Sequence, residues 1–410
     1  MFKNVISYRV PFVFVAGVFI IYQLVIREGI LPALIFAILP VIGIGCAGIF
    51  HGQLAFYAFF VINYFIMGIS RYFPMKTGMI MLGLTLGLLL LVFLKNIFHP
   101  YDWKRSRNFL TVIWLIWFVY CLLEIFNPTS VIQAWNIAIN GYAFFPLLSA
   151  ILIPILFTRY KDLKWLLILW AFLCLLAAAK GYWQRNHGFD SAELYWLLVE
   201  GGARTHFIYS GVRYFSFFSD AANYGTSMGL SMTIFGIIGF YVRPIWLKFL
   251  FWGTAVASFY GLMISGTRSA VIIPIVGLVT YLILCRNIKY MLFGICILTA
   301  SLLFLTQTNI GNENSLIRRM RTTFDKDDAS MQVRVINKKK MIPLLQDKPF
   351  GIGLGLSGGR ATRFNVDTPL AKLPPDSSHT ATWIETGIVG LLLYFCLLYT
   401  SPSPRDTERS

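Results

Sequence analysis

The strongest constraint on the fold of this chain is a series of twelve apolar segments, most of them long enough to cross a bilayer as a helix. Hydrophobic residues make up 57% of the 410 positions and charged residues only 13%, a balance typical of proteins that lie in lipid. Backbone amides in hydrocarbon must be satisfied within a segment, and the alternation of barrel strands is missing. The sequence therefore predicts an all-α, polytopic membrane helix bundle. The expected spans lie near residues 10–26, 30–49, 54–69, 78–94, 109–126, 131–157, 163–179, 221–240, 246–264, 268–284, 290–307 and 382–399.

The distribution of Lys and Arg between the short loops predicts how these helices are oriented. Short cytoplasmic loops are enriched in both residues. With a cytoplasmic amino terminus, the inner segments hold thirteen of them and the short outer hairpins hold three. Two longer segments, about 181–220 and 308–381, then face outward. The inner residues are Lys3, Arg9, Lys95, Lys104, Arg105, Arg107, Arg159, Lys161, Lys164, Arg243, Lys248, Arg286 and Lys289, and the outer ones are Arg27, Arg71 and Lys76.

The chain is expected to consist of two functional portions and a tail. Residues 1–180 hold seven helices with short connections, whereas residues 181–400 hold five helices and both long outer loops. Function is therefore expected in the second portion. The polar residues 401–410 end the last span abruptly and are interpreted as a non-native or truncated tail.

The charge and cysteine patterns exclude several classes of function. The formal net charge of +17 does not indicate a nucleic-acid partner, because most of it lies in the inner loops that set the topology. The basic second outer loop suits an anionic ligand or lipid head groups. The six cysteines lie in or at the ends of spans, without the spacing of a metal site. We expect no metal and no cofactor.

The first of three polar motifs leads into the expected span 221–240 from the outside. Arg213 offers a planar fork of donors that matches phosphate oxygens. Ser219, Asp220 and Asn223 lie where an outward-facing helix start would use capping groups. This segment alone supports two interpretations of Arg213 equally. Arg213 could contact phosphate, or it could be an interfacial Arg beside a helix cap.

The second motif, Ser265-Gly-Thr267-Arg268-Ser-Ala, is a tight polar break between two spans. It places a guanidinium at the outer membrane boundary beside hydroxyl groups and the amino terminus of a helix, which attracts anions. An Arg that served only as a topological anchor would lie on the inner side. Ser265, Thr267 and Arg268 are therefore predicted to contact an anionic substrate.

The third motif lies where the large outer loop joins the last span. His379 can remove a proton from a hydroxyl near neutral pH. Glu385 follows within the span, where a carboxylate is expensive and is usually kept for a function. Glu124 is similarly placed in the fifth span. The alternative to a functional role for it is a structural ion pair with an Arg.

Two further features lie in the large outer loop. Ser330–Leu345 is predicted to form an amphipathic helix that could lie along the membrane surface. The stretch from Gly351 to Gly359 contains a formal GxGxxG. A dinucleotide site is rejected, because that fingerprint belongs between a strand and a helix. A tight backbone turn close to a ligand or to the membrane is expected instead.

Four blocks with the right order and spacing resemble the O-antigen ligase and O-antigen polymerase family of bacterial membrane glycosyltransferases. They cover about 210–395. Ala222 stands where the family usually has Pro before the Asn. The blocks are Arg213 with Phe218, Asp220 and Asn223; Ser265 to Ala270; Arg334 with Pro349 to Gly355; and Ser378-His379 to Gly390.

This resemblance implies a GT-C-like bundle in the bacterial inner membrane that takes a glycan from undecaprenyl pyrophosphate on the extracytoplasmic side, without metal or nucleotide. Arg213 and Arg268 would hold the pyrophosphate, and His379 would orient or deprotonate the acceptor hydroxyl in the same pocket. Arg334 and Glu385, together with the polar groups beside the two arginines, would bind substrate.

The sequence leaves open which acceptor is used and whether the protein is an enzyme or a transporter. The acceptor would be a sugar of the lipid A core for a ligase, or another lipid-linked repeat for a polymerase. A polysaccharide-lipid transporter would also suit twelve spans. Transporters usually show related halves and ionisable residues near the midplane, whereas the charges of this chain gather at one face.

Overall fold

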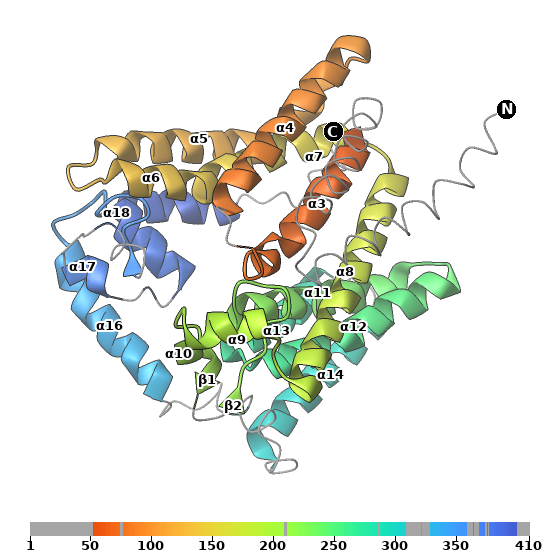
Figure 1. Ribbon diagram of the computed structural model, residues 1–410. Helices are drawn as coiled ribbons and strands as arrows, with labels where there is room; N and C mark the ends of the chain where they lie inside the picture. The colour runs from red at the N-terminus through yellow and green to blue at the C-terminus, as the bar shows by residue number, and fades with distance from the viewer. Residues whose placement is uncertain are drawn as a thin grey trace. The chain divides into compact units, whose positions relative to one another are not determined.

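The computed structural model shows a chain built almost wholly from helices (Figure 1). It describes residues 52–73, 77–208, 211–284, 288–308, 321, 329–358, 364, 369–373, 375 and 377–399. The expected spans at 10–26 and 30–49 and the tail at 401–410 lie outside these residues. The chain divides into two compact units, one of Met1–Val61 with Gly83–Asp102 and the other of Ile62–Leu82 with Trp103–Ser410. Every predicted site residue belongs to the second unit.

Helices occupy all ten of the expected spans that fall on described residues. Within the described residues, seven helical segments are long and apolar enough to cross a membrane, which supports an all-α, multi-pass membrane protein. The total of twelve spans and the GT-C-like arrangement stay predictions. The main elements are α3 (Gly52–Ile69), α4 (Thr77–Phe98), α5 (Phe109–Leu123), η2 (Glu124–Phe126), α6 (Ile132–Ile139), η3 (Asn140–Phe144), α7 (Phe145–Leu156), α8 (Tyr160–His187), α11 (Ala221–Tyr241), α12 (Ile245–Ser265), η4 (Arg268–Val271), α13 (Ile272–Leu284), α14 (Ile288–Gln307) and α18 (Ser378–Tyr399).

The two segments expected to form outer loops contain helices and a hairpin. The first holds α9 (Ser191–Leu198), α10 (Ala203–His206) and an antiparallel hairpin of β1 (Phe207–Ile208) and β2 (Gly211–Val212), which the sequence did not predict. In the second, α16 (Ala329–Leu345) confirms the helix expected at Ser330–Leu345, and α17 (Pro369–Lys372) follows. Met341 and Leu345 of α16 are buried, while the other apolar side chains that are described on this helix are exposed.

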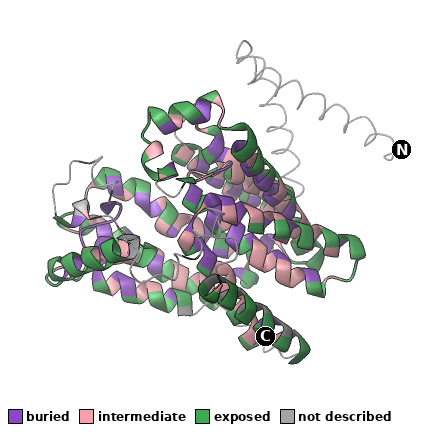
Figure 2. Cartoon of the chain, turned by 90° about the horizontal axis from the view of Figure 1, so that it is seen from below, coloured by how far each residue is buried: buried purple, intermediate pink, exposed green. Residues whose placement is uncertain are grey.

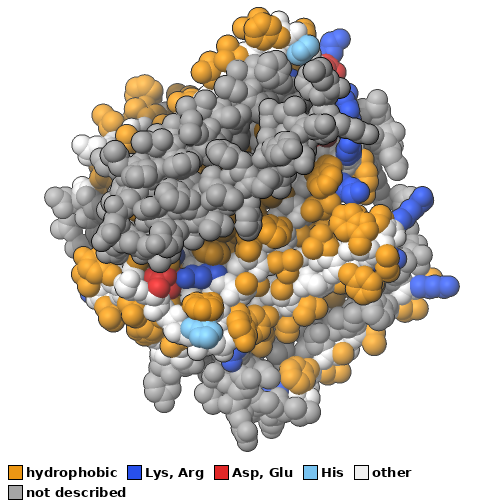
Figure 3. Space-filling model, turned by 45° about the vertical axis from the view of Figure 1, so that its right-hand side comes forward, with side chains coloured by type: hydrophobic (Ala, Val, Ile, Leu, Met, Phe, Trp, Pro, Cys, Tyr) orange, Lys and Arg blue, Asp and Glu red, His pale blue; other side chains and the backbone are white. Residues whose placement is uncertain are grey.

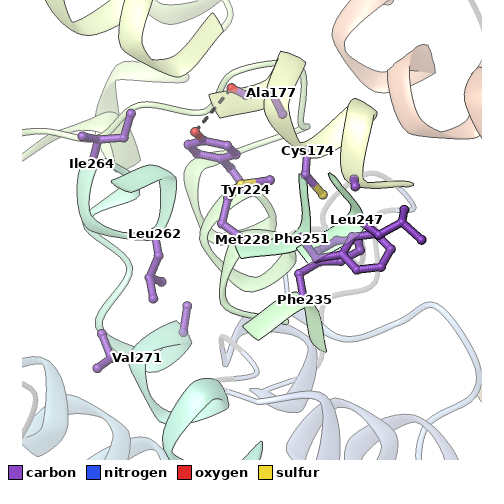
Figure 4. Packing of buried hydrophobic residues seen from close by; sticks show 12 residues of the cluster. Cys174, Ala177, Tyr224, Met228, Phe235, Leu247, Phe251, Leu262, Ile264 and Val271 are labelled. Carbon is purple, nitrogen blue, oxygen red and sulfur yellow. Dashed lines mark hydrogen bonds between the residues drawn. The ribbon is translucent and has the colours of Figure 1, made fainter. Parts of the chain in front are cut away.

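The main core of the second unit forms where α8, α11 and α12 pack together (Figures 2 and 4). Tyr224, Phe235 and Phe251 are fully buried there, and the Tyr224 hydroxyl donates to the Ala177 carbonyl oxygen at 3.4 Å. Glycines let these helices approach closely: a Cβ at Gly181 would lie 2.5 Å from the Tyr224 hydroxyl. This core fixes the start of α11 and the end of α12, from which the candidate site is built.

The outward faces of the helices are apolar, as lipid requires. Val256 and Phe249 of α12 are 70% and 69% exposed. On the face drawn in Figure 3, hydrophobic side chains cover most of the described surface. Such a surface would be unfavourable in water and is stable against lipid tails.

The last expected span, 382–399, is not one continuous helix. Gly387 has φ 65° and ψ −167°, outside the helical region. The His379 ring lies 5.9 Å from that of Tyr394, whereas fifteen residues of straight helix would separate them by about 22 Å. The segment Ser378–Leu398 has the length and composition of a span, but its two halves fold back on one another. The sequence looked continuous because apolar Trp383 and Ile384 stand shortly before Gly387 and an apolar run follows it.

We expect Gly387→Ala to destabilise the protein by about 3 kcal/mol or more, combining backbone strain with overpacking. An added Cβ would lie 2.0 Å from the Pro349 carbonyl oxygen, and the positive φ of residue 387 favours glycine. Thermal unfolding in detergent measures the effect. The control is Gly253→Ala, since a Cβ there meets no described atom within 4 Å. Equal melting temperatures for the two variants would contradict the reversal at Gly387.

Candidate functional site

Arg213 joins the first polar motif to the second. Its Nη2 donates to the Thr267 hydroxyl at 2.9 Å, and its Nε donates to the Ser265 carbonyl oxygen at 3.3 Å. Nη1 donates to the carbonyl oxygen of Thr205 at 3.1 Å. The structure thus brings together residues that are 52 and 54 positions apart in the chain.

The polar break after α12 is shaped to fit against the start of α11. Gly266 ends α12 in the left-handed conformation, with φ 57°. The buried Thr267 hydroxyl donates to the Ala221 carbonyl oxygen at 2.9 Å while it accepts from Arg213. A Cβ at Gly225 would lie 2.4 Å from the Ser265 hydroxyl, so α11 approaches the break closely. Ser265 and Thr267 therefore hold the two helix ends and Arg213 in one arrangement.

Arg268 is the first residue of η4 and lies half-buried near Arg213. The pKa of Arg213 is lowered, chiefly because the guanidinium is buried and further because of the positive charge of Arg268, while Asp220 raises it. Two like charges close together are unfavourable unless an anion offsets them. The pair is an arrangement suited to a doubly charged phosphate group.

Asp220 and Asn223 serve the start of α11. The Asp220 carboxylate accepts from the Asn223 backbone N–H at 2.8 Å and from the Asn223 side-chain amide at 3.0 Å. The Ser219 hydroxyl donates to the same carboxylate at 3.0 Å. The capping role expected of these residues is present, and any contact with substrate stays a prediction.

Arg71 supports the same site and was missed as a site residue. It donates to the carbonyl oxygens of Phe218 and Ser219, and its guanidinium lies over the rings of Trp196 and Phe215 at 4.5 and 4.3 Å. Burial lowers the Arg71 pKa to about 10. The sequence contained one signal, because Arg71 is one of only three Lys or Arg in the expected short outer hairpins.

Polar side chains fix the segment that precedes Arg213. His206 accepts from the Ala221 N–H through Nε2 at 3.1 Å, so its Nδ1 carries the proton and donates to the Gly202 carbonyl oxygen at 2.9 Å. Lys180 forms ion pairs with Asp190 and Glu193 at 3.2 and 3.1 Å. Burial lowers the pKa of His206, which keeps the imidazole neutral and the helix start bonded.

Glu385 binds the glycine segment of its own chain. Its buried carboxylate accepts from the Gly355 N–H at 2.9 Å, from the Ser357 N–H at 3.3 Å and from the Ser357 hydroxyl. Gly351, Gly353, Gly355 and Gly358 all have positive φ, so the expected tight turn is present. In this structure the carboxylate supports the loop, and its predicted substrate contact stays a prediction.

His379 and Arg334 belong to elements around this second cluster. Both side chains are exposed, on α18 and α16 respectively. The ring neighbours of His379 are Tyr394 and Phe395 of its own helix. The described contacts therefore bring Arg213 to the second motif, while a pocket shared with His379 stays a prediction.

Comparison with known families gives a match for residues 253–395. A family model described as O-Antigen ligase (Wzy_C) matches residues 253–395. This chain carries an O-antigen ligase domain. The resemblance found in the sequence motifs is confirmed for the family over these residues, and the match supports activity of the ligase or polymerase type on lipid-linked glycans and acceptors in general. Neither the curated proteins nor the solved structures give a match.

The limits of the O-antigen ligase match divide the candidate residues into two groups. Ser265, Thr267, Arg268, Arg334, His379 and Glu385 lie inside it, whereas Arg213, Asp220 and Asn223 precede it. Arg213 is nevertheless bonded to Ser265 and Thr267. The structure therefore extends the candidate site beyond the part of the chain that the family match covers.

Proposed function

We propose that this O-antigen ligase family protein transfers a glycan from undecaprenyl pyrophosphate to a sugar hydroxyl of the lipid A core. The reaction would take place on the extracytoplasmic face of the bacterial inner membrane, with the amino terminus in the cytoplasm. The observation that supports this most is the pair of arginines, Arg213 and Arg268, at the adjoining ends of α11 and α12.

The two arginines fit the electrostatic demand of this reaction. The bond between the anomeric carbon and a phosphate oxygen breaks, and negative charge grows on the departing pyrophosphate. One charge pair at 4 Å is worth about 4 kcal/mol at an effective dielectric near 20, before desolvation. Contacts that strengthen as the bond breaks would lower the barrier, and the hydrogen bonds of Arg213 to Ser265 and Thr267 hold its guanidinium in place beforehand.

His379 would orient or deprotonate the acceptor hydroxyl that attacks the anomeric carbon. Its imidazole is exposed at the start of α18, where a substrate can reach it. Arg334, Asp220, Asn223 and Glu385 would bind or support the substrates around these groups.

Replacing His379 by Ala is expected to lower turnover by about 100-fold, the usual contribution of a general base, with a much smaller change in donor binding. Single-turnover rates with purified protein and lipid-linked glycan measure this. An unchanged single-turnover rate would remove His379 from the chemistry.

Glycan analysis of a deletion strain tests the proposed function as a whole. A ligase predicts that lipid-linked polymer accumulates without attachment to the lipid A core. Single repeats capping the core would identify a polymerase, which the family also includes. An envelope glycan profile identical to that of the parent strain would contradict both.

A further inference from the structure

A cavity of about 690 Å³ lies between the end of α5 and the segment that precedes the glycine turns. Its wall includes Glu124, Phe126, Asp347, Lys348 and Phe350. In the proposed orientation α5 leads away from the inner Lys and Arg before it, so the cavity belongs to the outer side. Arg213, Arg268 and His379 are not among its described lining residues.

Glu124 makes this cavity unusual. The residue is only 4% exposed, although it ends an apolar helix where a carboxyl group is costly. The Asn127 amide donates to Oε2 at 3.0 Å, and the hydroxyl of the neighbouring Tyr120 donates to the Thr386 carbonyl oxygen at 2.7 Å. Among the described residues, a neutral amide thus takes the place of the structural Arg partner considered from the sequence. A carboxylate offers about four acceptor positions, which leaves room for donors from a ligand.

Two hydrogen bonds between separate segments of the chain hold the wall of the cavity in place. The Asn127 amide also donates to the Phe350 carbonyl oxygen at 3.1 Å, and the Thr129 hydroxyl donates to the Ile352 carbonyl oxygen at 2.9 Å. These bonds tie the α5–α6 connection to residues more than two hundred positions later. A cavity with fixed walls binds a ligand at lower entropic cost.

The charges and rings of the wall select the class of ligand. The carboxyl groups of Glu124 and Asp347 face one ammonium group, that of Lys348, so a phosphate group would be repelled. Phe126 and Phe350 are 81% and 53% exposed and offer apolar ring faces beside the polar groups. Aromatic surface with a few hydrogen-bonding groups suits an uncharged saccharide, which has both hydroxyl groups and apolar C–H faces.

We propose that this cavity binds the uncharged saccharide part of one of the two glycan substrates, away from the reacting bond. Glu124 accepts from sugar hydroxyls, and Phe126 and Phe350 pack against sugar rings. The identity of the ligand as a substrate glycan rests on the proposed function.

Phe350→Ala and Glu124→Gln test this proposal in the full chain, reconstituted in lipid nanodiscs. The rate of transfer is measured against the concentration of lipid-linked donor and then of acceptor, both extracted from the source cells. We expect the half-saturating concentration of one of the two substrates to rise about tenfold, with a maximal rate within about twofold of wild type. The substrate affected tells which glycan the cavity holds. Tyr195→Ala, an exposed aromatic residue of α9, is the matched control and should behave as wild type.

The test separates this proposal from the proposed function. If Phe350→Ala keeps the wild-type dependence on both substrates, the saccharide site is refuted while the transfer reaction stands. If the wild-type protein forms no glycosidic bond, the transfer reaction is refuted. Saturation-transfer NMR with the donor and acceptor glycans freed from lipid then tests whether the cavity binds saccharide, independently of the transfer reaction. A signal that the wild type gives and Phe350→Ala loses supports the site. Equal signals from the two proteins, or no signal from the wild type, overturn it.

Discussion

Replacing Arg268 by Lys is expected to reduce glycan transfer by at least about 100-fold while the protein still inserts into the membrane. Lys keeps the positive charge but offers a single ammonium in place of the planar fork that matches two phosphate oxygens. Removing one preorganised donor from a developing oxyanion commonly costs two to three powers of ten in rate. Formation of the new glycosidic bond is measured with the purified protein in nanodiscs.

The matched control for Arg268→Lys is Arg243→Lys, which makes the same change just after the opposite end of α11. Arg243 is exposed and belongs to an expected inner loop. We expect this control to transfer glycan at the wild-type rate. Near-normal transfer by Arg268→Lys would show that bidentate contact with phosphate is not needed.

Glu385→Gln is expected to loosen the glycine segment around Gly355 and Ser357. Any change in substrate binding is expected to follow from that loosening. The carboxylate accepts from two backbone amides and one hydroxyl in a buried place, and hydrogen bonds to a charged acceptor are worth about 1.5–3 kcal/mol each. Gln keeps one acceptor oxygen and turns an amide toward donors. Hydrogen exchange of the Gly355 and Ser357 amides should accelerate at least tenfold.

An exposed carboxylate provides the comparison for this experiment. Glu200→Gln removes a charge at an exposed position of the first outer loop and should leave the exchange of Gly355 and Ser357 unchanged. Unchanged exchange in Glu385→Gln as well would mean that the carboxylate does not hold the segment, and its substrate role would then be the stronger explanation of its burial.

The helices and the cap of the candidate site follow from local sequence. Apolar runs of sufficient length predict the helices from α3 to α8 and from α11 to α14, and Ser219-Asp220 before Ala221 predicts the start of α11. The bond between Arg213 and Thr267 could not be predicted, since it depends on how α11 and α12 pack. The sequence only indicated that both motifs belong to the same side of the membrane.

Other features depend on tertiary structure that local patterns do not encode. The role of Arg71 depends on Trp196 and Phe215, which lie more than a hundred positions away in the chain. Gly387 looks in the sequence like an ordinary helix glycine, because apolar Trp383 and Ile384 stand shortly before it and an apolar run follows it. It changes the neighbours of His379, which the sequence placed at the start of a straight span.

The proposal that Arg213 and Arg268 hold a diphosphate is tested most directly by binding of undecaprenyl pyrophosphate to the full chain in nanodiscs. We expect the wild type and Arg243→Lys to bind it with equal affinity, and Arg268→Lys to bind it at least about ten times more weakly. Equal dissociation constants for all three proteins would show that Arg268 does not hold the diphosphate.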